Sequence, residues 1–195
     1  TVCLILGLFW EFQNRMKSNN GIVGENPFWD FSLKFYEYNS VASSCIALQE
    51  SVNADVNILL YCCWIASEGA VVIEPAEFTE IIEAIEPWQS FVVQGLRKIR
   101  VDMKNEKLMY FDKMAEDLRE SIKECELEGE RVEQMILYRS GQQLFVNESV
   151  QILERIGNAR TNLRNYIETI SGGISETTDK FIQIISNDLR VAIDG

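Results

Sequence analysis

Residues 55–69, DVNILLYCCWIASEG, decide the fold of this chain. Asp55 is suited to cap the start of a helix and Gly69 to end it, so the segment between them is predicted to be helical. Its apolar side chains surround the helix almost completely instead of keeping to one face. Because such a helix has no side suited to water, it belongs at the centre of a bundle, and it is too short to span a membrane.

Two amphipathic helices are predicted before this central one. The first begins at Asn26, an N-cap residue, with Pro27 at the first helical position. Its apolar face has residues three and four positions apart: Phe28, Phe31, Phe35 and Tyr38. Ser40 is predicted to cap the second helix, whose apolar face has a similar spacing: Val41, Cys45, Leu48 and Val52.

The pattern that follows the central helix is also helical. Pro75 is expected to begin a helix that Pro87 breaks or kinks, and the next helix runs to about Met103. A long charged helix is predicted over about residues 106–139, with an interruption near Gly129.

Beyond Gly141 the composition changes. Apolar residues form a stripe near heptad spacing: Val146, Val150, Leu153, Ile156, Leu163, Ile167 and Ile170. Ser175 is suited to cap a last amphipathic helix. These two helices either dock on the bundle or form a homodimer seam through residues 146–170.

The predicted fold class is therefore all-α. We expect a multi-helix bundle with a buried, apolar central helix and two C-terminal amphipathic helices. Three parts are predicted: a flexible or non-native leader at 1–25, a helical domain at 26–139, and C-terminal helices, docked or dimerising, at 140–195.

The composition excludes several chemistries. The 195 residues fit one compact domain, and an apolar content of 47% is enough to build a core. The absence of histidine excludes Ser-His-Asp and Cys-His catalysis, imidazole bases and histidine metal sites. The net charge of −12 opposes binding to nucleic acid and to anionic membranes. We expect an acidic protein with neither kind of partner.

The cysteines favour free thiols in a reducing compartment. There are five of them, an odd number: Cys3, Cys45, Cys62, Cys63 and Cys125. The adjacent pair Cys62 and Cys63 would point about 100° apart on a helix, which suits neither a disulfide nor paired metal ligands. Because free buried thiols are typical of the cytosol, we expect a cytoplasmic protein.

The first residues carry a separate apolar run at 1–10, which is too short to cross a bilayer and has no cleavage site after it. We interpret Met16 as the natural start and 1–15 as upstream or non-native sequence. The alternative is a truncated signal segment, which would place the protein outside the cytoplasm.

The chain resembles a known family over about residues 26–139. The resemblance is to short helical proteins of Gram-negative bacteria that are described only as a conserved domain of unknown function. It implies no activity, cofactor or catalytic residue, and it departs at Gly95, where similar proteins have proline. The matching residues are Phe28 to Leu33, Tyr36, Val41-Ala42, Cys45, Leu48-Gln49, Asp55-Val56-Asn57, Leu59-Leu60, Trp64, Gly69, Glu86 to Gln89, Val92-Val93, Leu96-Arg97, Arg100, Glu126-Leu127-Glu128 and Glu130.

A basic stripe is the sharpest chemical feature of the sequence. Arg97, Arg100, Lys104 and Lys107 share one helical face in an otherwise acidic chain. One interpretation is a site for a small anionic ligand or an acidic segment of a protein partner. The alternative is pairing inside the chain with the acidic helix that follows, and we favour it over the first interpretation by about two to one.

The other candidate residues have simpler explanations. Trp29, Trp64 and Trp88 are candidates for lining a pocket, although aromatic residues at helical spacing usually pack in a core. Asp55 is a candidate acid or base that is better explained as an N-cap. The spacing of Asp112, Glu116 and Asp117 suggests a magnesium cluster, but an acid-rich helix supplies such spacings by chance.

Function is therefore predicted only in outline. The first hypothesis is a non-enzymatic helical binding or interaction protein that uses the basic stripe. The alternative is a carboxylate-dependent enzyme or small-molecule sensor with a tryptophan-lined pocket between helices. We predict no catalytic residue, metal site or cofactor.

Overall fold

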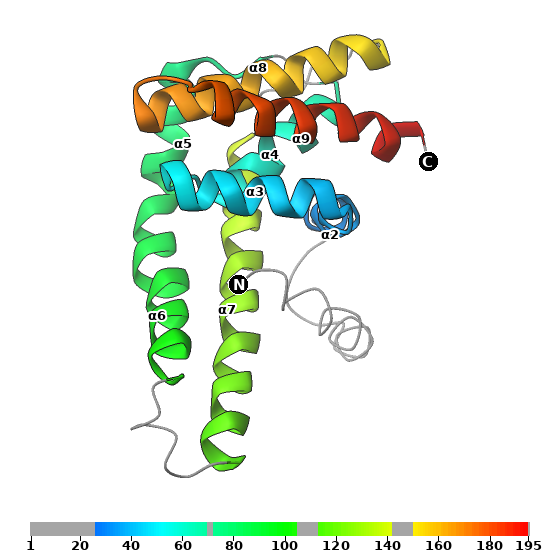
Figure 1. Ribbon diagram of the computed structural model, residues 1–195. Coiled ribbons are helices and arrows are strands. Elements are labelled where there is room, and N and C mark those ends of the chain that lie inside the picture. Colours follow the sequence, from blue (N-terminus) through cyan, green and yellow to red (C-terminus); the bar gives the residue numbers. More distant parts are fainter. Residues whose placement is uncertain (1–25, 70–71, 105–112, 142–149, 195) are drawn as a thin grey trace.

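The computed structural model describes residues 26–69, 72–104, 113–141 and 150–194. Throughout these ranges the regular structure is helical, which confirms the predicted all-α bundle. Figure 1 shows α5, η1 and α6 as one continuous rod beside α7, with α3, α8 and α9 lying across one end. The elements are α2 (Pro27–Tyr36), α3 (Asn39–Val52), α4 (Val56–Ser67), α5 (Pro75–Trp88), η1 (Gln89–Val93), α6 (Gln94–Asp102), α7 (Lys113–Ser140), α8 (Ile152–Ser171) and α9 (Glu176–Asp194).

Helix α4 is the buried centre that its sequence predicts. Every residue from Asn57 to Ser67 is buried, because α2, α7 and α8 all pack against this helix. Asp55 caps its first turn by accepting a hydrogen bond from the backbone N–H of Asn57 at 2.7 Å. The ring of Phe28 on α2 lies 5.5 Å from that of Tyr61, within the range of a stabilising aromatic pair.

The two C-terminal helices pack on the bundle. Leu163 and Ile167 of the apolar stripe are fully buried inside the same chain, so this part of the stripe leaves no free seam for a partner. The phenol oxygen of Tyr166 accepts a hydrogen bond from the backbone N–H of Asp55 at 2.7 Å. Val146 at the start of the stripe lies outside the described residues.

Ser40 does not cap α3, which begins one residue earlier, at Asn39. Its hydroxyl instead donates a hydrogen bond of 2.5 Å to Asp188 on α9. The N-cap prediction was wrong because a contact between helices distant in the sequence uses the side chain that local capping would have used.

The helix that carries Pro87 does not break. Proline lacks the N–H that would bond to the carbonyl one turn earlier, and the chain continues through one wide π turn, η1, into α6. Helix α7 is likewise uninterrupted at Gly129, where a side chain would meet Val93 at 3.5 Å. The carbonyl of Gly129 accepts a hydrogen bond from the indole of Trp88 at 2.9 Å. Gly129 therefore brings α7 close to η1 instead of ending the helix.

Two glycine substitutions are expected to have opposite effects on stability. At Gly141 an added Cβ would lie 1.8 Å from the hydroxyl oxygen of the fully buried Tyr61, so Gly141→Ala should lower the free energy of unfolding by about 3 kcal/mol. At Gly157, inside α8, nothing lies within 4 Å, and Gly157→Ala should raise it by about 0.5–1 kcal/mol. Urea unfolding followed by circular dichroism measures both. Equal effects would contradict the packing at Gly141.

In the ranges that the structure describes, none of the helices combines the length and apolar character needed to cross a bilayer.

A polar pocket between α2, α4 and α7

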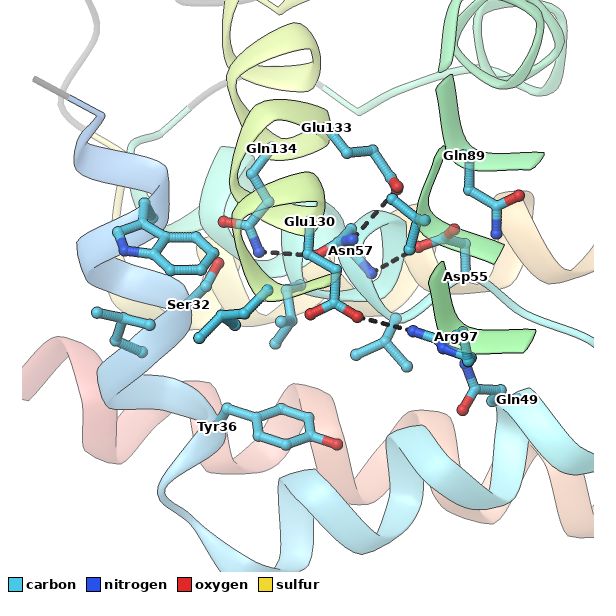
Figure 2. Close-up of a pocket in the computed structure, with 16 residues that line it drawn as sticks. Ser32, Tyr36, Gln49, Asp55, Asn57, Gln89, Arg97, Glu130, Glu133 and Gln134 are labelled. Carbon is cyan, nitrogen blue, oxygen red and sulfur yellow. Dashed lines mark hydrogen bonds and ion pairs between the residues drawn. The ribbon is translucent and has the colours of Figure 1, made fainter. Parts of the chain in front are cut away.

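A pocket opens where the N-terminal end of α4 meets α2, η1, α6 and α7 (Figure 2). The space inside it that is open to water is about 70 Å³. One water needs about 10–15 Å³ of such space, so the pocket has room for several waters or for one small polar molecule. The residues that line it are Trp29, Ser32, Leu33, Tyr36, Gln49, Asp55, Val56, Asn57, Leu60, Gln89, Val93, Arg97, Leu127, Glu130, Glu133 and Gln134.

Three side chains on α4 and α7 form a fixed chain of hydrogen bonds. Asn57 donates through Nδ2 to Oε1 of Glu133 at 3.2 Å, so its own oxygen must face Gln134. Gln134 donates through Nε2 to that oxygen at 2.8 Å. Because the carboxyl group of Glu133 accepts from Asn57, it fixes the orientation of the Asn57 amide and, through that, of the Gln134 amide. In this orientation the oxygen of Gln134 remains available as an acceptor.

Asp55 and Glu133 form a pair of carboxyl groups. Their charges act on each other inside the pocket, and Oε2 of Glu133 has no hydrogen-bond partner among the described residues. Burial raises the pKa of Glu133 to about 9, and the charge of Asp55 adds to this effect. Burial also raises the pKa of Asp55, against the opposing effects of the Asn57 N–H and of Arg97. Near neutral pH the pair therefore holds a proton.

An ion-pair network closes one side of the pocket. Arg97 contacts Glu126 at 2.8 Å and Glu130 at 2.7 Å, and Arg100 contacts Glu126 at 2.5 Å. Burial opposes the ionisation of Glu126, but the hydrogen bonds from Arg100 and Arg97 outweigh it and lower its pKa. Burial raises the pKa of Glu130 to about 7, although the charge of Arg97 partly offsets this effect. The network therefore stays ionised at Glu126 and titrates near neutral pH at Glu130.

Three buried polar atoms on residues that line the pocket have no hydrogen-bond partner among the described residues. They are the amide oxygen of Gln134, Oε2 of Glu133 and the hydroxyl of Ser32, on residues that are 2%, 0% and 3% exposed. Buried polar groups are nearly always hydrogen-bonded, since leaving one unsatisfied costs about 1–3 kcal/mol. These atoms line a space large enough for a molecule that would satisfy them.

The structure places the two arginines of the basic stripe against α7. Arg97 and Arg100 form ion pairs inside the chain, which is the second of the two interpretations of the sequence. Their partners are Glu126 and Glu130, while Glu116 and other acids nearer the start of α7 pair with bases on their own helix. The two arginines therefore hold carboxylates of this chain. Lys104 is exposed at the end of α6, and Lys107 lies outside the described residues.

Of the three tryptophans predicted to line a pocket, Trp29 does so. The guanidinium of Arg131 lies over its ring, 5.8 Å from the centroid. Trp64 instead packs in the core, 5.2 Å from Phe28, and Trp88 bonds to the backbone of α7. Trp64 and Trp88 do not line the pocket for the same reason. Their rings are turned toward neighbouring helices, whose positions the sequence does not give.

Sequence reasoning missed most of the polar lining. Asp55 is the N-cap that we predicted, and it also faces Glu133 across the pocket. A signal was present on α7, where Glu126, Glu130 and Glu133 recur at the spacing of one helical face. Buried acids on an inward face indicate a polar site, but the sequence does not tell an inward face from an outward one on so charged a helix.

The described ranges contain no group of three or more Asp, Glu or Cys side chains arranged to hold a metal ion. Of the suggested magnesium cluster, Asp117 is exposed on α7 and Asp112 lies outside the described residues.

Comparison with known proteins gives a family but no relative. The family model described as "Protein of unknown function (DUF2390)" matches residues 27–137, which is more than half of the chain. Neither the curated proteins nor the solved structures contain a significant match. The matched region includes α2 to α6 and nearly all of α7, and so every residue that lines the pocket. The chain therefore belongs to the DUF2390 family of proteins of unknown function.

Proposed function

We propose that this chain is a binding protein for a small polar molecule and that the pocket between α2, α4 and α7 holds it. The observation that carries the proposal is the set of buried, unpartnered polar atoms on Ser32, Glu133 and Gln134, three residues that line an open space. The carboxyl pair of Asp55 and Glu133 adds polar groups that a ligand would contact. The basic stripe is not part of the proposal as a surface, since Arg97 and Arg100 are ion-paired inside the chain.

The size of the pocket sets the expected affinity. A water-accessible space of 70 Å³ corresponds to roughly five non-hydrogen atoms. Very small ligands gain at most about 1.5 kcal/mol per atom, so the tightest affinity to expect is micromolar, and millimolar binding is more usual. Larger molecules would have to extend out through the mouth of the pocket.

The π turn supports the same location. Insertions of this kind inside α-helices are frequent at functional sites, and Gln89 and Val93 of η1 both line the pocket. Trp29 provides an aromatic side chain in the pocket lining, of the kind that orients small ligands.

A second candidate function is catalysis by the carboxyl pair. A protonated Glu133 beside an ionised Asp55 would form a general acid and a general base within one site. The raised pKa of Glu133, about 9, is the observation that favours this alternative. A ligand that is chemically altered during the binding experiment below would support it.

Filling the pocket is expected to abolish ligand binding. Saturation-transfer NMR of the full chain with a panel of amines, amides, alcohols and carboxylates of up to six non-hydrogen atoms should detect binding by at least one class. Ser32→Leu should remove that signal, because the larger side chain occupies the space beside Gln134. Ser43→Leu, at an exposed position on α3, is the matched control and should bind as the wild type does.

Circular dichroism must show that Ser32→Leu keeps its helices. If it does not, Leu33→Trp at a half-buried position of the same pocket takes its place. The proposal fails if no class binds the wild type, or if both pocket variants fold and bind as tightly as the wild type does.

A cytoplasmic location is part of the proposal. It is supported by the free cysteines of the described ranges, since unbridged thiols are typical of reducing compartments. These are Cys45, Cys62, Cys63 and Cys125.

A further inference from the structure

We infer that the ligand of the pocket is a small organic cation, a protonated amine or a guanidinium, held between the Asp55 and Glu133 carboxyl groups and the free oxygen of Gln134. This inference rests on the proposed function and adds the chemical class of the ligand to it.

The charges around the pocket leave the carboxyl pair without a cation. Arg97 and Arg100 are matched by Glu126 and Glu130, with which they form ion pairs. Arg131 does not line the pocket; it lies over the ring of Trp29, which does, and contacts Glu128 at 3.8 Å. Among the described residues, Asp55 and Glu133 have no ion pair.

Buried charges require a partner of opposite sign, so two adjacent carboxyl groups must take up a proton or a cation. The proton is the partner in the absence of ligand, because burial raises the pKa of both carboxyl groups, and Oε2 of Glu133 is left without a hydrogen-bond partner among the described residues. An ammonium ion carries the same charge as the proton that it would replace. It also carries several N–H groups, which a single shared proton does not provide.

The free hydrogen-bonding atoms also call for a donor. The unpartnered oxygen of Gln134 is a carbonyl oxygen and can only accept, and the nitrogen of this amide donates to Asn57. Carboxylate oxygens likewise only accept, and the hydroxyl of Ser32 can do either. A carboxylate or phosphate ligand has no hydrogen to offer these oxygens and would be repelled by the pair. The described ranges contain no group of three or more acidic or cysteine side chains that could hold a metal ion.

Figure 2 shows how the groups lie. Asp55 projects from the start of α4, and Glu130, Glu133 and Gln134 project from successive turns of α7, with Ser32 on the opposite wall. Trp29 also lines the pocket, and its aromatic ring can offer a face to an alkyl chain. A short alkylammonium thus finds oxygens for its charged end and an apolar wall for its carbon atoms.

Binding of a cation should compete with the proton. The ionisable groups that face the pair are Arg97 on α6, Glu130 on α7, Tyr166 on α8 and, in the pocket wall, Tyr36 on α2. Of these, Glu130 has a pKa of about 7 and also loses its proton as pH rises. Loss of the proton from the carboxyl pair and loss of the proton from Glu130 each add negative charge. The affinity for a cation should therefore increase with pH by up to about tenfold per unit for each proton released.

The test compares n-propylammonium with propionamide and propionate, which have similar size and differ in charge. Each is titrated into the full chain, and ¹H–¹⁵N spectra follow the side-chain amides of Asn57 and Gln134 and the indole of Trp29. We expect n-propylammonium to bind at least tenfold more tightly than either other molecule. Its affinity should rise between pH 6 and pH 8, and Glu133→Gln should weaken its binding at pH 8 by at least tenfold.

The outcomes separate this inference from the proposed function. Binding of the amide or the carboxylate as tightly as the amine, with loss in Ser32→Leu, overturns the cation and leaves the pocket as a binding site. No binding by any molecule of this set or of the wider panel overturns both. Amine binding that is unchanged in a folded Glu133→Gln variant overturns the role of the carboxyl pair. Glu83→Gln, an exposed position on α5, is the control for a general charge effect and should leave affinity unchanged.

Discussion

Replacing Glu126 with alanine should lower the free energy of unfolding by about 3–5 kcal/mol. The side chain of Glu126 is 2% exposed and accepts hydrogen bonds from both Arg97 and Arg100, at 2.5–3.1 Å. Removing it leaves the side chain of Arg100, 6% exposed, without a counter-ion, and an uncompensated buried charge is what makes such changes costly. Urea unfolding at pH 7, followed by circular dichroism, measures the change.

A surface pair provides the matched control. Lys98 and Asp102 lie 2.5 Å apart on α6, with side chains that are 76% and 57% exposed. Because exposed pairs contribute little, Asp102→Ala should change the free energy of unfolding by no more than about 0.5 kcal/mol. If Glu126→Ala costs as little as this control, α6 is not held to α7 by the arginines. The double variant Arg100→Met with Glu126→Leu should recover part of the loss, since it removes the unpaired charge as well.

The fold could be predicted from the sequence where the residues of one segment alone decide whether it is buried or where its helix begins. The apolar run of α4 has no polar side, so only a central position suits it, and the structure places it there. Asn26 and Asp55 each accept a hydrogen bond from the first turn of the helix that follows, as local capping predicts. These inferences need only neighbouring residues, which is why they succeed.

Features that depend on a distant helix were not predictable in the same way. The chain does not break at Pro87, because the turn that absorbs the proline packs on Gly129 of α7, 42 residues further along the chain. Asp55 was assigned to a cap alone, since nothing in its neighbourhood points to Glu133. The pocket is formed by segments separated by up to about a hundred residues, and its unpartnered atoms become visible only when all of them are in place.

The stability of the protein should depend on pH through Glu133. Its pKa is raised by burial to about 9 in the folded chain, whereas the ordinary value is 4.5. Between these two values the folded state holds a proton that the unfolded state has lost, so the free energy of unfolding falls as pH rises. The contribution is fully present below about pH 4.5 and is lost progressively up to about pH 9, by at most about 1.4 kcal/mol per unit.

Glu133→Gln should remove this dependence. The amide can accept from Asn57 as the carboxyl group does and carries no charge, so it imitates the protonated acid at every pH. Relative to the wild type, the variant should gain about 2–4 kcal/mol in the free energy of unfolding on going from pH 5 to pH 8. Urea unfolding at several pH values measures this difference directly. Glu83→Gln should follow the wild-type curve, because its side chain is exposed. If Glu133→Gln follows the wild-type curve too, the buried carboxyl pair does not hold a proton, and an ammonium ion would then have none to displace.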